Sequence, residues 1–113
     1  MLNGWKNLTQ TSEVDDAIAH SSIKPVVFFK HSTRCSISSM ALNRLKVLDT
    51  DVLETASFYY LDLIAHRDVS NYIAEKLDVH HESPQIIVVR DSECTYDASH
   101  MEIEVKELIS EIS

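Results

Sequence analysis

Glycine is almost absent from this chain of 113 residues, in which only Gly4 occurs. The P-loop and the dinucleotide-binding fingerprint need glycines where the backbone approaches a phosphate closely. The nucleophile elbow of serine hydrolases needs two glycines around its serine. The sequence therefore excludes these motifs, and Ser36, Ser38 and Ser39 are first interpreted as residues of the first turn of a helix.

Positive charge and long apolar runs are also scarce. The chain has ten basic and 18 acidic residues, which gives a net charge of −8. A general nucleic-acid binder needs a clustered basic footprint, and a membrane span needs ~18 consecutive apolar residues. The first residues lack the apolar stretch of a signal peptide. We therefore expect a cytoplasmic protein without nucleic-acid or membrane partners.

Cysteine is limited to Cys35 and Cys94, which lie far apart in the chain. Without an export signal, the two are expected to be free thiols in a reducing compartment rather than a structural disulfide. A zinc site built from Cys35, His80 and His81 would lack a second ligand pair at the usual spacing, so no metal site is predicted. His20, His66, His80 and His81 are all expected at the surface.

The apolar pattern that is present predicts one α/β domain over residues 1–113. An apolar content of 44% suffices for a chain of this length to bury a core without disulfides. After an extended segment around Trp5, the periodicity predicts helices over 12–21, 35–49, 65–77 and from 99 onward, and strands over 26–31, 56–63, 86–89 and 94–98. A βαβ unit followed by ββα gives a central mixed sheet of about four strands flanked by four helices. This is the arrangement of a thioredoxin-like fold.

Cys35 lies at the junction between a predicted strand and a predicted helix. The apolar run 26–29 gives way to a polar connection, and the apolar residues after Cys35 recur at steps of three or four. The unpaired N–H groups and positive dipole end of a helix N-terminus favour a thiolate over a thiol. Lys30, His31 and Arg34 lie close in sequence, either as solvated residues or as groups that stabilise the thiolate and meet substrate carboxylates.

Five short motifs in this order resemble the YtxJ-type monothiol bacilliredoxins, a thioredoxin-like family. They are Phe29-Lys30-His31-Ser32-Thr33, Cys35-x-Ile37-Ser38, Ser70-Asn71-Tyr72-Ile73-Ala74, His81-Glu82-Ser83-Pro84-Gln85 and Ala98-Ser99-His100. The resemblance implies an enzyme that removes bacillithiol from mixed disulfides on oxidised cytosolic proteins. It implies no bound cofactor, with bacillithiol, a low-molecular-weight thiol, as co-substrate.

The resemblance also implies roles for single residues. Cys35 would be the nucleophile, and Thr33, Arg34, Ser36 and Ser38 would support it. Ser38 stands where a dithiol enzyme has its resolving cysteine, so an outside thiol must release the product; its hydroxyl is expected to hydrogen-bond the sulfur or to act only as a helix residue.

The family resemblance also bears on the loop before the third main strand and on two departures from the family pattern. A cis Ser83-Pro84 bond would place the Ser83 backbone beside Cys35, whereas an ordinary strand-start proline would be trans. The family usually has proline at position 36 and tryptophan at position 101, where this chain has Ser36 and Met101.

The hairpin near the C-terminus predicts two further features. Cys94 would lie at the end of the sheet opposite to Cys35, on the order of 20 Å away, too far for a disulfide. Ser99 and His100 would return to the edge that holds Cys35 and Pro84. If a last helix starts at Ser99, its N-terminus and His100 form a site for bacillithiol carboxylates, unless Ser99 and Glu102 only cap each other.

A function of a different class stays open at this level. The same groove on a thioredoxin-like fold can serve a non-catalytic module that binds a protein or peptide, because fold alone does not fix function. The reactivity of Cys35 distinguishes the two.

We predict that Cys35 reacts with iodoacetamide at mildly acidic pH, where an ordinary cysteine is almost fully protonated. The alkylation rate as a function of pH, followed by intact mass, measures this. A midpoint equal to that of a free cysteine, ~8.5, would contradict the activated thiolate.

Overall fold

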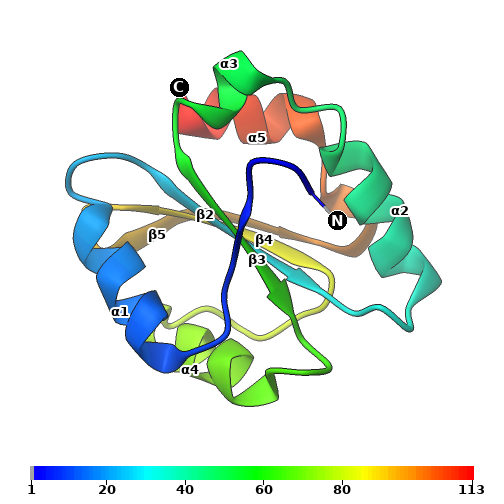
Figure 1. Cartoon of the computed structure of the whole chain (residues 1–113), viewed down its shortest axis with the longest axis horizontal. Coiled ribbons are helices and arrows are strands. Elements are labelled where there is room, and N and C mark those ends of the chain that lie inside the picture. Colours follow the sequence, from blue (N-terminus) through cyan, green and yellow to red (C-terminus); the bar gives the residue numbers. More distant parts are fainter. Residues whose placement is uncertain (1) are drawn as a thin grey trace.

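The central strand β2 (Val26–His31) is buried along its whole length in the computed structural model, which describes residues 2–113. It lies between β3 (Ser57–Asp62), parallel to it, and β4 (Gln85–Arg90), antiparallel to it. The sheet order is β1-β3-β2-β4-β5, with β1 (Lys6–Asn7) and β5 (Glu93–Ser99) at the edges (Figure 1). The predicted mixed α/β sheet is confirmed, and its additional fifth strand is the two-residue β1.

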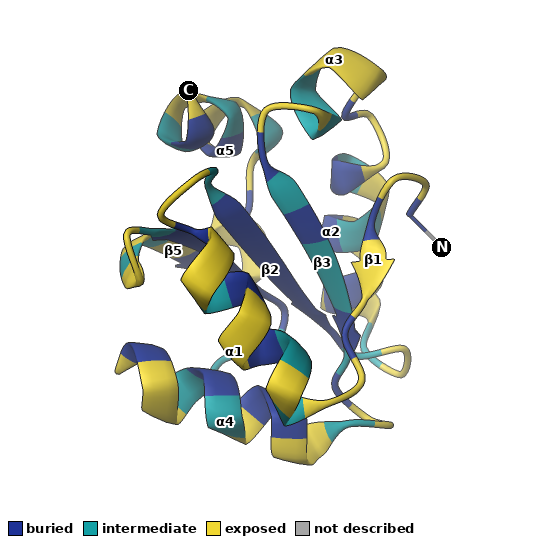
Figure 2. Cartoon of the chain, turned by 60° about the vertical axis from the view of Figure 1, so that its left-hand side comes forward, coloured by how far each residue is buried: buried dark blue, intermediate teal, exposed yellow. Residues whose placement is uncertain are grey.

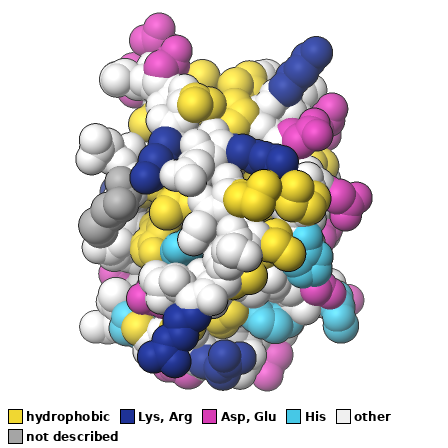
Figure 3. All heavy atoms as spheres, turned by 90° about the vertical axis from the view of Figure 1, so that its right-hand side faces the viewer, with side chains coloured by type: hydrophobic (Ala, Val, Ile, Leu, Met, Phe, Trp, Pro, Cys, Tyr) yellow, Lys and Arg dark blue, Asp and Glu magenta, His cyan; other side chains and the backbone are white. Residues whose placement is uncertain are grey.

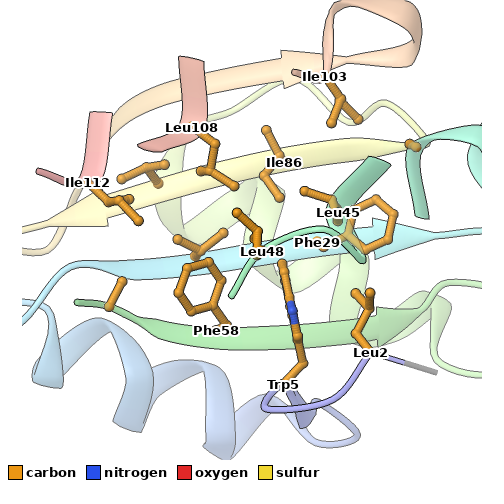
Figure 4. Close-up of a cluster of buried hydrophobic side chains, with 14 of the residues drawn as sticks. Leu2, Trp5, Phe29, Leu45, Leu48, Phe58, Ile86, Ile103, Leu108 and Ile112 are labelled. Atoms are coloured by element: carbon orange, nitrogen blue, oxygen red, sulfur yellow. The ribbon is translucent and has the colours of Figure 1, made fainter. Parts of the chain in front are cut away.

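Helices cover both faces of the sheet (Figure 2). On one face, α1 (Thr11–His20) and α4 (Arg67–Leu77) pack against Val26, Phe28 and their neighbours. On the other, α2 (Ser36–Leu45) and α5 (Val105–Ile112) pack against Val27, Phe29 and the buried Trp5 (Figure 4). Alternate residues of β2 thus serve two separate cores, as a pleated strand buried on both faces requires.

Two helix boundaries differ from the prediction. The helix expected over 35–49 ends at Leu45, and Asp49 instead caps a short helix α3 (Thr50–Leu53) by accepting a hydrogen bond from the Val52 N–H at 3.0 Å. The expected helix start at Ser99 is wrong, because residues 100–102 form only a 3-10 turn, η1 (His100–Glu102), before α5 begins. The chain therefore has five α-helices within residues 2–113 rather than four. None of these helices has the length and apolar character needed to span a bilayer.

Cys94 lies at the end of the sheet that the sequence predicts. It pairs with Val89, and Val89 pairs with Val26 at the start of β2, whereas Cys35 follows the end of that strand. Five residue steps at ~3.3 Å separate the two ends of β2, about 17 Å. Both cysteines are free.

Arg44 ties α2 to the turn η1. Its Nη1 donates hydrogen bonds to the carbonyl oxygens of Met101, at 3.1 Å, and Ile103, at 2.9 Å. These bonds hold the end of the β4–β5 hairpin against the helix that starts at Cys35.

We predict that Arg44→Met lowers the free energy of unfolding by about 1–2 kcal/mol, the net value of two such bonds. Guanidinium denaturation measures it. The matched control is Lys46→Met at the C-cap of the same helix, because the exposed Lys46 side chain makes no hydrogen bond or ion pair within residues 2–113. Equal stability of the two variants would contradict the role of Arg44.

Candidate active site

Three segments meet at the edge of the sheet where β2 ends. Lys30 in β2 pairs with Gln85 in β4, and Gln85 pairs with Ser99 in β5. The His100 N–H donates to the Pro84 carbonyl at 3.0 Å. The loop that leads to Cys35, the Ser83-Pro84 segment and the Ser99-His100 segment therefore share this edge, as the hairpin topology predicts.

Cys35 is the N-cap residue of α2. Its backbone is extended (φ −112°, ψ 124°), its N–H donates to the Ser32 carbonyl at 3.2 Å, and its carbonyl accepts from the Ser39 N–H at 3.0 Å. The residue is partly exposed, and its thiol makes no capping hydrogen bond in the described chain. Cys35 thus places a sulfur that solvent can reach at the N-terminus of α2, which is the setting of a nucleophilic cysteine.

Ser38 makes a buried hydrogen-bonded cluster rather than the expected bond to sulfur. Its hydroxyl oxygen accepts from the Ser32 N–H at 2.9 Å and lies 2.7 Å from His31 Nδ1. Burial lowers the pKa of His31, so its ring is neutral at pH 7. The Ser38 hydroxyl still has its own proton to donate, and a neutral His31 ring with its proton on Nε2 offers Nδ1 as the acceptor.

Lys30 and His31 are not solvated residues. They are the last two residues of β2, with 0% and 3% of their surface exposed, and they project to opposite faces of the sheet. The His31 ring stacks on Phe29 at 5.6 Å between centroids. Neither side chain can meet a substrate carboxylate, so Arg34, which is exposed beside Cys35, is the cation left at the site. Thr33 and Ser36 are exposed there as well.

The Ser83-Pro84 peptide bond is cis, which confirms the prediction. Pro84 is buried, and the Ser83 hydroxyl oxygen is buried without a hydrogen-bond partner in the described residues. His81, just before this segment, is not a surface residue as expected: it is half-buried and its ring contacts Lys30 and Ser70.

His100 reaches this edge in a different way from the one predicted. The Ser99–Glu102 capping box does not form, because Ser99 ends β5 and makes no capping side-chain bond, while His100 has a left-handed backbone with φ 55°. Because α5 starts only at Val105, the N-terminus of the last helix does not lie at His100. Its position comes instead from its N–H bond to Pro84.

Glu82 is a site residue that the sequence analysis missed. Its two carboxylate oxygens lie 3.4 Å from His80 Nε2 and 3.4 Å from His100 Nε2. Its place directly before Ser83-Pro84 was the available signal for this site. The pairing of Glu82 with His100 depends on the β4–β5 hairpin, so no local sequence pattern predicts it. Glu82 offsets part of the positive charge that a protonated His100 brings to the groove.

The surface around this site is partly apolar. Ile37 and Met40 on α2 and Met101 on η1 are 39%, 47% and 50% exposed. Figure 3 shows the side of the molecule that carries α2, where hydrophobic side chains gather among charged side chains of both signs and His side chains. A substrate can therefore make apolar contacts next to Cys35.

Comparison with known proteins gives the family. The family model described as Monothiol bacilliredoxin BrxC matches residues 6–108. The chain belongs to this family. A solved structure of a candidate oxidoreductase with a thioredoxin fold is 31% identical to this chain, with a TM-score of 0.78. The match covers 93% of this chain and 90% of that one. Family and fold together make this bacilliredoxin a thiol–disulfide oxidoreductase.

Thioredoxins share its fold at lower identity. The thioredoxin of Malassezia sympodialis is 13% identical with a TM-score of 0.77, over 96% of this chain and 90% of that one. The thioredoxin of Fasciola hepatica is 15% identical with a TM-score of 0.75, over 96% of this chain and 99% of that one. These likenesses confirm the predicted thioredoxin-like fold.

We predict that Ser38→Ala lowers the free energy of unfolding by about 1–3 kcal/mol, because it leaves the Ser32 N–H and His31 Nδ1 without their partner in a buried site. Thermal or denaturant unfolding measures the loss. Ser39→Ala is the matched control, since Ser39 is exposed on the same turn. A Ser38→Ala variant as stable as the control would show that the cluster contributes nothing.

Proposed function

We propose that this bacilliredoxin removes bacillithiol from mixed disulfides on oxidised cytoplasmic proteins by a monothiol reaction at Cys35. The observation that carries the proposal is the pairing of Cys35, at the start of α2, with a serine rather than a thiol three residues later. The other cysteine lies at the far end of the sheet. No second thiol of this chain is therefore within reach to resolve a disulfide on Cys35.

The reaction is a disulfide exchange without net change in oxidation state. The Cys35 thiolate attacks the bacillithiol sulfur of the mixed disulfide, forms a Cys35–bacillithiol disulfide and expels the substrate protein's thiolate, which takes a proton from water. A second, external thiol then attacks the bacillithiol sulfur and releases Cys35 as thiolate. Bacillithiol is thus a co-substrate, and the chemistry requires no resident cofactor.

The residues near Cys35 are suited to this reaction. The Ser83 backbone on the neighbouring segment is suited to pair with the incoming disulfide, and the exposed Thr33, Arg34 and Ser36 surround the sulfur on the side of α2. Arg34 and His100 are the groups suited to the malate carboxylates of bacillithiol, with Ser99 adjacent. The anion site proposed here rests on these side chains and not on the N-terminus of the last helix, which starts only at Val105.

We expect oxidised bacillithiol to add one bacillithiol to the protein, on Cys35, at least about tenfold faster than oxidised glutathione adds glutathione, a factor equal to ~1.4 kcal/mol of differential binding. Intact mass over time measures both rates. Cys35→Ser abolishes the adduct and Cys94→Ser keeps it. Equal rates for the two disulfides would contradict bacillithiol specificity, and a Cys35 inert to both would favour a binding module.

We expect His100→Asn to slow bacillithiol transfer by about two- to fivefold, because a charge contact of this kind contributes 0.3–1 kcal/mol. Asparagine is chosen over alanine because it tolerates the left-handed backbone at this position. The transfer rates of the variant and of the wild-type protein are compared at pH 6 and at pH 8. Iodoacetamide alkylation of Cys35 is the control and stays unchanged. Unaltered transfer at both pH values would remove His100 from the site.

A further inference from the structure

A buried polar cluster lies beneath the Ser83-Pro84 segment, on the face of the sheet covered by α4. The fully buried Lys30 ammonium donates hydrogen bonds to the Ser70 carbonyl at 3.2 Å and to His81 Nδ1 at 3.2 Å. The Ser70 hydroxyl also lies 3.2 Å from His81 Nδ1. No carboxylate of residues 2–113 lies within ion-pair distance of Lys30. A buried cation held only by neutral groups is costly and calls for a function.

The hydrogen-bond roles in this cluster are fixed by chemistry. An ammonium can only donate, so His81 Nδ1 must accept and its proton must be on Nε2. Burial and then the nearby Lys30 lower the pKa of His81, with Arg67 and His80 acting in the same direction and Glu82 opposing them. Burial lowers the pKa of Lys30 to about 8. The intact cluster therefore consists of a neutral imidazole and a charged lysine at neutral pH.

The cluster holds the active-site loop from the inside. His81 lies in the connection between α4 and β4, two residues before Ser83. Lys30 and Gln85 are ladder partners on neighbouring strands, so their side chains lie on the same face. Gln85 Nε2 donates to the His80 carbonyl at 3.0 Å while Lys30 binds the His81 ring. Two buried side chains from β2 and β4 thus fix consecutive residues of the loop that carries Ser83.

We propose that Lys30 and His81 are positioning residues that hold the Ser83 backbone where it meets an incoming disulfide, and that protonation of His81 releases this loop. A protonated His81 would direct an N–H group at an ammonium and a hydroxyl, so the contact with Lys30 would be lost. The inference rests on disulfide exchange at Cys35, as in the proposed function, but it does not depend on bacillithiol.

The test uses two reactions of Cys35 on the whole protein. In the first, the thiolate attacks one sulfur of the neutral 2-hydroxyethyl disulfide, forms a mixed disulfide and expels 2-mercaptoethanol; in the second, iodoacetamide alkylates the same sulfur. Both need the thiolate, but only the disulfide needs backbone pairing at Ser83. The ratio of the two rates between pH 7 and pH 5.5 therefore reports the loop alone. A neutral probe also leaves the carboxylate contacts of His100 and Arg34 out of the measurement.

For the wild-type protein we expect this ratio to fall at least about fivefold as the pH drops below the ordinary histidine value of ~6.5, well within the ~10²-fold that a 1 Å misplacement can cost. His81→Ala has the low ratio already at pH 7. His81→Asn keeps an acceptor oxygen for Lys30 that does not titrate, so it keeps the wild-type ratio at pH 7 and loses the fall in acid. His20→Ala, which removes an exposed histidine at the C-terminal end of α1, behaves as wild type.

Lys30→Met provides the second arm, because it removes the charge and keeps the apolar stem. We expect a low ratio at all pH values, because the His81 ring loses the buried donor that holds it. If this variant does not fold, the three histidine variants carry the test by themselves. A wild-type ratio that does not change with pH, or a His81→Asn ratio as low as that of His81→Ala, would overturn the proposal. A protein that exchanges with 2-hydroxyethyl disulfide but not with oxidised bacillithiol would refute only the proposed function.

Discussion

The complete burial of β2 is the constraint on which the rest of this structure depends. Strands close both of its sides and helices close both of its faces, so each of its six residues lies in the interior, including the polar pair at its C-terminal end. A buried polar side chain must find a partner. His31 finds Ser38 on the α2 face, and Lys30 finds Ser70 and His81 on the α4 face. The end of one strand thereby connects both helical layers to the edge that holds Cys35.

This arrangement anchors the helix that presents Cys35 in the core of the protein. The helix that presents Cys35 contributes Ala41 and Leu45 to the hydrophobic cluster around Phe29 (Figure 4). Its first turn is fixed to β2 by the Ser38 cluster, and its last turn is fixed to the β4–β5 hairpin by Arg44. The backbone amides near the sulfur are thus held by contacts at both ends of α2, and preorganised amides cost no rearrangement when charge develops on the sulfur.

The sequence predicted the elements whose signal is local and missed those that depend on tertiary pairing. The apolar run of β2 and the helical periods of α1 and α4 are local, and they were placed to within about two residues at each end, the usual uncertainty of such boundaries. The stretch from Ser99 to Glu102 matches a capping box equally well, yet Ser99 is bound into the ladder with Gln85 and His100 adopts a left-handed backbone. No local pattern contains the pairing that overrides the cap. The same holds for Asp49, which was assigned to a helix end and caps the next helix.

The residues of the site also fall into those that local sequence predicts and those that depend on tertiary packing. Cys35 and the Ser83-Pro84 segment follow from a strand–helix junction and a short motif, so they could be found without coordinates. The contacts of Lys30, His31 and His81 could not. A polar residue at the end of an apolar run is normally solvated, and only the packing of α2 and α4 buries Lys30 and His31 and half-buries His81. Glu82 was missed for a related reason: one of its two histidine partners comes from the other end of the hairpin.

The separation of the two thiols allows them to be labelled one after the other. Burial and then the nearby Asp97 raise the pKa of Cys94, and its thiol donates to the Tyr96 carbonyl at 3.5 Å within the edge strand β5. A raised pKa leaves less of the reactive thiolate at a given pH. We therefore expect one alkylating agent to modify Cys35 first, so that a second agent, added at higher pH, marks Cys94 at the opposite end of the sheet.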